Sequence, residues 1–434
     1  MAEFETVLLN TLLADDKAIA VGVMYPGEDT PSGVPLVRIA DIVDGRISST
    51  IGYRISEEVN AQYRRTQLSG DEVLMTLVGR PGIAIKVPTA MRGWNAARAL
   101  AVLRLANPEE RDFFVYSVAS PQVQHTIRNW CNTTVQATLN LKEIKALPLP
   151  WPDRATRRAI AATLGALDDK IELNRKMNAT LEAIARALFR DWFVDFCPTR
   201  ARMEARAPTL SPDLWSLFPD RLDDEGKPEG WELSTIGDEV RVVGGSTPST
   251  KEPDLWDGGI NWATPKDLSN LAAPVLLETS RTITEAGLAK ISSGLLPIGA
   301  LLLSSRAPIG YLAIAEVPVA INQGFIGMIC DKRLSNVFAW LWTLENMEAI
   351  LAKANGSTFQ EISKGNFRPL PVVVAPDAVL LAFDAIARPL YERIAKNERE
   401  SRTLAQTRDL LLPRLMSGEL RVADLAASEQ ETAA

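Results

Sequence analysis

The sequence predicts a mixed α/β protein in which two related domains are each followed by a long helix, and the two helices pair as an antiparallel coiled coil. Three features support this fold class: an internal repeat, two heptad patterns, and many short apolar segments closed by Gly or Pro. The chain has 434 residues, which is enough for two or three domains, and its composition is that of a globular protein.

The heptad patterns define the two long helices. Apolar residues recur at alternating spacings of four and three from Ile160 to Leu188, and again from Phe383 to Leu411, 223 positions later. This spacing is the seam of a coiled coil. Pro-Asp pairs at 152–153 and 376–377 precede the two stretches, and an Asp carboxylate can accept hydrogen bonds from the first turn. We expect the first helix to run to about residue 191, roughly 60 Å at 1.5 Å per residue.

Polar residues interrupt both seams and suggest a register. If the helices are antiparallel, Asn174 lies opposite Ser401 and Asn178 opposite Asn397, while small residues face large ones farther along. A buried polar layer can fix a register at some cost in stability. Alternatively, these polar residues face a partner or solvent. The residues predicted to form the seam are Leu164, Leu167, Ile171, Asn174, Asn178, Leu181, Leu188, Leu390, Ile394, Asn397, Ser401, Leu404 and Leu411.

The repeat extends upstream of each helix into the domains. Residues 79–83 (Gly-Arg-Pro-Gly-Ile) are similar to residues 306–310 (Arg-Ala-Pro-Ile-Gly), and Trp94-Asn95 is similar to Ile321-Asn322. The chain is therefore two copies of one module rather than a solenoid. We predict a first domain (1–150), a first spacer helix (151–197), a proline-containing linker (198–230), a second domain (231–374), and a second spacer helix with the C-terminal region (375–425).

The sequence contains no recognisable catalytic or cofactor motif. There is no phosphate-binding loop and no glycine-rich methyl-donor loop, and the three cysteines and single histidine form no metal-binding pattern. We therefore expect no enzyme activity, no cofactor and no metal. The net charge of −7 disfavours coating of nucleic acid but allows a local basic contact with DNA. Without a leader peptide or a long apolar run, the chain is expected to be cytoplasmic.

Three segments carry a family resemblance: residues 164–174 with the helix exit 188–196, residues 228–232 (Pro-Glu-Gly-Trp-Glu), and residues 411–420. Together with the repeat, they resemble the specificity (S) subunits of type I restriction-modification systems over nearly the whole chain. The similarity is specific in the helices and at the C-terminus, and loose inside the domains. The first domain departs from the pattern because it lacks the Gly-Trp opening of the second.

The resemblance implies a function without catalysis. Each domain would be a target-recognition domain that reads half of a split, asymmetric site in double-stranded DNA, and the helices would set the gap between the halves. Two modification (methyltransferase) subunits and two restriction (ATP-dependent translocase and nuclease) subunits would be the partners. Two other functions stay open: a specificity subunit whose partner combines methylation and cleavage in one chain, and a coiled-coil scaffold without a DNA role.

Candidate contacts are polar residues in loops and at strand ends, because base edges and phosphates are bound by such side chains. In the first domain they are Arg38, Arg54, Arg64, Arg65, Arg80, Asn95, Arg98, Thr134 and Gln136. In the second domain they are Ser246, Thr247, Ser249, Thr250, Lys251, Thr264, Lys266, Ser304, Ser305, Arg306, Ser357, Thr358, Gln360 and Lys364. The apolar residues Phe189, Trp192 and Phe193 are candidates for binding a modification subunit, and they equally fit an intrachain core at the helix exit.

Overall fold

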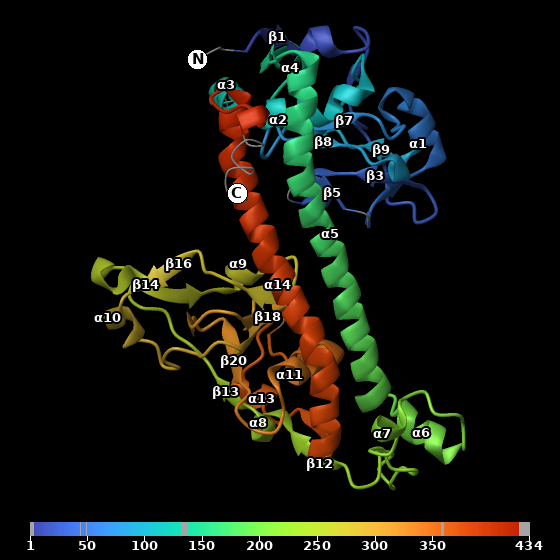
Figure 1. Ribbon diagram of the computed structural model, residues 1–434, viewed down its shortest axis with the longest axis vertical. Helices are drawn as coiled ribbons and strands as arrows, with labels where there is room; N and C mark the ends of the chain where they lie inside the picture. The colour runs from blue at the N-terminus through green and yellow to red at the C-terminus, as the bar shows by residue number, and fades with distance from the viewer. Residues whose placement is uncertain (1–3, 44, 49, 132–137, 357–359, 425–434) are drawn as a thin grey trace. The chain divides into compact units, whose positions relative to one another are not determined.

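The computed structural model describes residues 4–43, 45–48, 50–131, 138–356 and 360–424 (Figure 1). The chain divides into two compact units, one formed by residues 1–170 with 404–434 and the other by residues 171–403. Each unit contains helices and strands, as predicted for a mixed α/β chain. Within the described ranges, no helix is long and apolar enough to cross a membrane.

Two long helices follow the two domains, α5 (Arg154–Phe193) and α14 (Asp377–Met416) (Figure 1). The start of α5 has the predicted cap, because Asp153 accepts a hydrogen bond from the Thr156 amide at 3.1 Å and another from its hydroxyl at 2.6 Å. In α14, Asp377 is the first helical residue rather than the residue before the helix. Its charge still lies in the first turn, where it favours the helix dipole.

In the second unit, α5 and α14 pair through a buried polar layer. The Asn397 side chain donates a hydrogen bond from Nδ2 to Asn178 Oδ1 at 2.8 Å, and Asn174 Nδ2 donates to Ser401 Oγ at 3.2 Å. All four side chains are buried. One pair lies earlier on α5 and later on α14 than the other, so the helices run antiparallel in the predicted register.

In the first unit, the other ends of the same helices meet in an apolar cluster. Leu164 of α5 is fully buried and packs in one cluster with Leu411 and Leu415 of α14 and with Phe113 of the domain. Leu164 and Leu411 fit the same register as the polar layer. Beside this cluster, Arg408 Nη1 donates to Asp168 Oδ1 at 2.7 Å, so a polar residue of the α14 seam is ion-paired.

The described residues of the first domain form one four-stranded sheet, one three-stranded sheet and two two-stranded sheets. The larger sheet has the order β2 (Ile19–Val21), β10 (Leu100–Leu103), β7 (Val73–Thr76) and β8 (Ala84–Lys86), all antiparallel. The smaller sheets are β6 (Arg54–Ile55), β3 (Val34–Val37) and β9 (Asn95–Ala96), and β1 (Thr6–Leu8) with β11 (Pro148–Pro150); β4 (Ile42–Val43) and β5 (Arg46–Ile47) form a hairpin. The helices are α1 (Glu57–Gln62), α2 (Arg111–Ala119), α3 (Pro121–Cys131) and α4 (Leu141–Lys145).

The second domain repeats three of these sheets. Its larger sheet has one more strand, and among its described residues there is no counterpart of the β4–β5 sheet. Its larger sheet has the order β13 (Arg241–Val243), β20 (Phe325–Ile329), β17 (Leu301–Ser305), β18 (Ile309–Ala315) and β15 (Val275–Leu276). Its smaller sheets are β16 (Arg281–Ile283), β14 (Trp256–Ala263) and β19 (Val319–Ile321), and β12 (Glu232–Thr235) with β21 (Pro371–Val374). The helices are α8 (Ile236–Glu239), α9 (Pro265–Leu268), α10 (Glu285–Leu288), α11 (Asn336–Glu345), α12 (Met347–Ala352) and α13 (Lys364–Phe367).

The turn after the central strand shows how closely the two domains correspond. In the first domain, buried Thr76 accepts from the amide seven residues later at 3.0 Å and donates to the carbonyl four residues later. Buried Ser304 makes the same two bonds in the second domain, both at 2.8 Å. Thr76 and Ser304 are therefore equivalent, and the offset in this turn is 228 residues.

This equivalence corrects the alignment of residues 79–83 with residues 306–310 by one position. Gly79 corresponds to Ala307, and both have a left-handed backbone, with φ of 75° and 56°. Pro81 and Pro308, which the sequence comparison had matched, take different places in the two turns. The alignment of the two domains in this turn therefore follows the hydroxyls of Thr76 and Ser304 rather than the two prolines.

The helix exit of α5 forms the aromatic core of the second unit. Phe189 and Trp192 are 2% and 0% exposed, and Phe193 is 6% exposed. Their rings contact Phe338 of α11 and Phe383 of α14 at centroid distances of 4.9–6.0 Å. Of the two alternatives for these three residues, the structure shows the intrachain core at the helix exit, and burial within their own unit leaves little side-chain surface for a partner subunit.

Candidate nucleic-acid interface

Three loop segments meet at one edge of the first domain, and their counterparts meet in the second. We call this feature the loop edge; it comprises residues 22–25, 77–82 and 97–99 of the first domain, and residues 245–248, 305–310 and 322–324 of the second. In the first domain, Val23 N donates to Ala96 O at 2.7 Å and Leu77 N donates to Ala99 O at 2.9 Å. These backbone bonds hold the three segments together.

The second domain makes the matching bonds. Ser246 N donates to Ile321 O at 3.1 Å, and Ser305 N donates to Gly324 O at 2.8 Å. Both first segments begin with a glycine in close contact with the opposite backbone: a Cβ would lie 2.2 Å from Ala96 O at Gly22 and 1.7 Å from Ile321 O at Gly245. Only glycine permits this approach. The scaffold is thus the same, and the exposed side chains differ.

Exposed polar side chains gather along the loop edge of the second domain. Thr247 donates from Oγ1 to Gln323 Oε1 at 2.6 Å. Lys364 is the first residue of α13, and its ammonium lies 3.1 Å from the position that a Cβ of Gly244 would occupy. Arg306 is partly exposed and lies 3.7 Å from the Glu361 carboxylate. Gln323 was not among the residues predicted from the sequence, where its only signal is that it follows Asn322, the end of the repeated segment.

Several predicted contacts of the second domain serve the fold instead. Ser304 and Ser305 are buried, with Ser304 closing the β17–β18 turn. Thr264 forms a capping box with Asp267 at the start of α9. Ser246 Oγ donates to the carbonyl of Lys290 at 2.9 Å. The predicted residues that are exposed are Thr247, Ser249, Thr250, Lys251, Lys266, Gln360 and Lys364.

In the first domain, Asn95 also serves the fold, and two of the predicted arginines make local contacts. Asn95 is fully buried, and its Nδ2 donates to Asn60 Oδ1 at 2.9 Å. Arg38 pairs with Asp41 at 3.4 Å, and Arg54 Nη1 donates to Gly33 O at 3.0 Å. These side chains fix local backbone. The predicted residues Thr134, Gln136, Ser357 and Thr358 lie outside the described residues.

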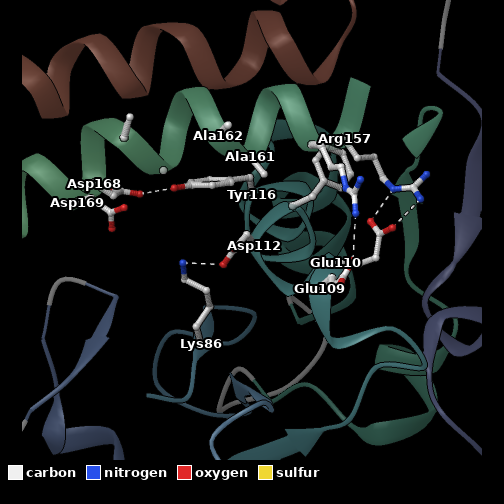
Figure 2. Close-up of a pocket in the computed structure, with 14 residues that line it drawn as sticks. Lys86, Glu109, Glu110, Asp112, Tyr116, Arg157, Ala161, Ala162, Asp168 and Asp169 are labelled. Atoms are coloured by element: carbon white, nitrogen blue, oxygen red, sulfur yellow. Dashed lines mark hydrogen bonds and ion pairs between the residues drawn. The ribbon is translucent and has the colours of Figure 1, made fainter. Parts of the chain in front are cut away.

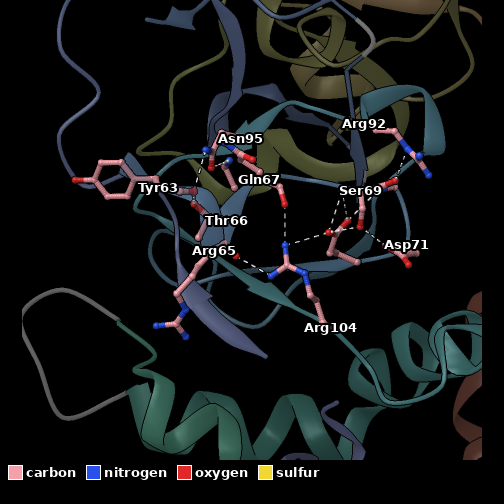
Figure 3. Close-up of polar contacts among 12 residues, drawn as sticks. Tyr63, Arg65, Thr66, Gln67, Ser69, Asp71, Arg92, Asn95 and Arg104 are labelled. Carbon is pink, nitrogen blue, oxygen red and sulfur yellow. Dashed lines mark hydrogen bonds and ion pairs between the residues drawn. The ribbon is translucent and has the colours of Figure 1, made fainter. Parts of the chain in front are cut away.

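A basic loop of the first domain is held by an ion pair whose carboxylate is buried (Figure 3). Arg104 of β10's end donates to the carbonyls of Arg65 and Gln67, both at 2.7 Å, and to Glu72 Oε1 at 3.2 Å. The Glu72 side chain is 0% exposed and also accepts from the amides of Ser69 and Gly70. These bonds tie the loop of residues 64–72 to the end of β10.

Arginines project from this loop and from the loop edge of the first domain. Arg64 and Arg65 are exposed on the held loop, where Arg65 Nη2 also donates to the carbonyl of Lys17 at 2.9 Å. Arg80 and Arg98 are exposed on the loop edge. Arg104 and Glu72, which position the loop, were not selected from the sequence, because they follow and precede apolar strands and look like ordinary strand-end charges.

The first unit also has a charged cavity of about 370 Å³ beside α5 (Figure 2). Arg157 contacts Glu110 at 2.7 Å, Lys86 contacts Asp112 at 2.8 Å, and Tyr116 donates to Asp168 at 2.6 Å. The hydrogen bond from Arg157 holds the pKa of Glu110 below its usual range, whereas burial raises the pKa of Tyr116. The Arg157–Glu110 ion pair and the Tyr116–Asp168 hydrogen bond attach the domain to α5, whereas the Lys86–Asp112 pair lies within the domain. Across the described ranges, no group of three or more His, Cys, Asp or Glu residues could hold a metal.

Comparison with known proteins agrees with this architecture. Residues 228–378 match the family described as the type I restriction modification DNA specificity domain. The chain is 25% identical over 327 residues to the type I restriction enzyme HindI specificity subunit of Haemophilus influenzae, an alignment that covers 65% of this chain and 71% of that protein. It is 27% identical over 288 residues to the MjaIX specificity subunit of Methanocaldococcus jannaschii, covering 65% and 62%.

The fold is also similar to that of a solved S subunit. A crystal structure of a type I restriction-modification system S subunit from M. genitalium superposes with a TM-score of 0.55 at 15% identity, covering 95% of this chain and 96% of that one. The family match, the relatives and this fold confirm the resemblance predicted from the sequence, to the specificity subunits of type I restriction-modification systems.

Proposed function

We propose that this chain is the non-catalytic DNA-specificity subunit of a type I restriction-modification system and that it binds a bipartite, asymmetric target. The observation that carries the proposal is the repeated loop edge: two domains share one backbone scaffold and differ in the exposed side chains at equivalent places. One scaffold with two sets of side chains suits the reading of two different half-sites. The proposed recognition domains are residues 1–150 and 231–374.

The proposed DNA contacts are the predicted residues that the fold leaves at the surface. Arginine and lysine suit phosphates, and arginine, glutamine and hydroxyl side chains suit base edges. The contacts in the first domain are Arg64, Arg65, Arg80 and Arg98. Those in the second domain are Thr247, Ser249, Thr250, Lys251, Lys266, Arg306, Gln360 and Lys364.

The helix pair is proposed as the spacer that fixes the gap between half-sites. A buried polar layer supports this role, because an amide facing leucine after a slip of one heptad would lose its partner. Two modification subunits and two restriction subunits are the proposed partners. The support is the duplication, which offers equivalent surfaces to identical partners, and the relatives, whose names place them in type I restriction enzymes.

The decisive experiment is co-expression of this chain with the modification subunit encoded beside it, followed by mapping of DNA methylation by single-molecule sequencing. We expect a single split motif with a fixed gap. Deleting seven residues from each long helix should change the gap or abolish assembly, while the sequence of each half stays the same. A matched deletion of seven residues in one helix alone, which destroys the register, should abolish assembly.

Absence of any motif, despite a stable complex and an intact methyl-donor site, would contradict the proposal and leave the scaffold function. The identity of the partner that copurifies separates the two restriction classes: a subunit that only methylates supports type I, whereas one chain that both methylates and cleaves supports the fused class.

A further inference from the structure

Two exposed residues, Arg98 and Gln323, occupy the same backbone position in the two domains. In the first domain, the carbonyl of Ala96 accepts from the amide of Val23, which follows the close-contact glycine, and Arg98 lies two residues after Ala96. In the second domain, the carbonyl of Ile321 accepts from the amide of Ser246 in the same way, and Gln323 lies two residues after Ile321. Each is also followed by the residue whose carbonyl accepts from the central segment, Ala99 or Gly324. The equivalence therefore rests on two backbone bonds on either side of the residue.

The strands that follow confirm this equivalence. Leu100 of β10 pairs with Thr76 of β7, and Phe325 of β20 pairs with Ser304 of β17. Thr76 and Ser304 are the equivalent residues that close the turn in each domain. Arg98 lies two residues before Leu100, and Gln323 lies two residues before Phe325. Two matched backbone bonds and a paired strand therefore flank this position in both domains, and the side chains that it carries differ.

The chemistry of the two side chains is that of base recognition in the major groove. Both are exposed. An arginine guanidinium can donate two parallel hydrogen bonds to O6 and N7 of guanine, and a glutamine amide can bond N6 and N7 of adenine. Thr247 donates to Gln323 Oε1 at 2.6 Å, which fixes the side of the amide that bears oxygen and leaves the Nε2 hydrogens free to donate. A second lone pair on Oε1 can still accept from N6 of adenine.

We propose that Arg98 and Gln323 are equivalent specificity-determining residues, with Arg98 reading a guanine in the half-site of the first domain and Gln323 an adenine in the half-site of the second. The inference rests on the proposed function. It deepens that function by assigning one base pair of each half-site to one residue, with Thr247 as the positioning residue for Gln323.

The test is a reciprocal exchange in the complex with the modification subunit, read by methylation mapping. Gln323→Arg should convert one A·T pair in one half-site to G·C and leave the other half-site unchanged. Arg98→Gln should convert one G·C pair to A·T in the opposite half-site only. Each change should alter the preference for the two base pairs about 10-fold to 100-fold. Thr247→Val should weaken discrimination at the Gln323 position without changing the preferred base.

A control adds the same charge elsewhere: Thr209→Arg, on an exposed segment outside both proposed domains, should leave the motif unchanged. An unchanged motif in both exchange variants would overturn the inference. So would equal weakening of methylation at all sites, because that result identifies phosphate contacts, and so would a change in both half-sites. If the unsubstituted complex methylates no motif, the proposed function fails instead, and the two failures are distinct.

Discussion

Replacing Arg104 with methionine should release the basic loop of the first domain. The substitution keeps an unbranched apolar stem but leaves the Glu72 carboxylate, 0% exposed, without its cation, and it frees the carbonyls of Arg65 and Gln67. Breaking a buried pair from one side costs roughly 3–5 kcal/mol. Arg104 is one-third exposed, and water can reach its place, so we expect a loss of about 3 kcal/mol, at the lower end of that range.

Hydrogen exchange measured by mass spectrometry tests this loss locally. A loss of about 3 kcal/mol corresponds to roughly 100-fold faster exchange of the Ser69 and Gly70 amides, which donate to Glu72. Arg104→Lys should show an intermediate effect, because an ammonium keeps the charge without the planar fork. Lys86→Met is the matched control: its contact with Asp112 is exposed and worth about 1 kcal/mol at most. An Arg104→Met exchange rate within about 3-fold of the original would refute the reasoning.

Two further predictions concern the helix pair. Asn397→Ala should destabilise the second unit in urea unfolding by about 2 kcal/mol, because Asn178 Oδ1 is buried and loses its donor. The double variant with Asn178→Leu and Asn397→Leu should recover most of this loss. A double variant no more stable than Asn397→Ala would contradict the prediction. Burial raises the pKa of Glu398, so ionisation weakens the fold as pH rises through the ordinary glutamate pKa and beyond. Glu398→Gln should therefore raise Tm at about pH 8 and have little effect at about pH 4; equal shifts at both would argue against it.

The features that the sequence predicted best are those encoded by a long repeat. The register of α5 and α14 follows from the spacing of asparagine, serine and leucine, because the residues at the seam positions of a heptad all lie on the one face of the helix that packs on its partner. Asn174 and Asn178 could therefore be assigned to the layer from the sequence alone. The domain class followed from the same repeat.

Single polar residues in the domains were harder to predict. Asn95 and Ser304 look like loop residues in the sequence, yet each satisfies buried backbone or side-chain groups, and nothing local distinguishes these tasks from contact with DNA. Trp192 was ambiguous for the opposite reason: an apolar helix exit fits either a core or an interface, and the choice depends on distant residues such as Phe383. Gln323 was missed because its position becomes evident only when the two domains are compared bond by bond.

The loop edge has a consequence for how such a protein changes over generations. Its segments are joined by backbone amides and carbonyls and by close-contact glycines, and the exposed side chains take no part in these backbone bonds. A substitution at Arg98 or Gln323 therefore leaves folding nearly untouched, in the way that exposed positions generally tolerate change. Variation can explore new side chains at these positions without a loss of solubility or abundance. A scaffold built in this way is evolvable: new preferences can arise by single steps, and each domain can drift independently of its duplicate.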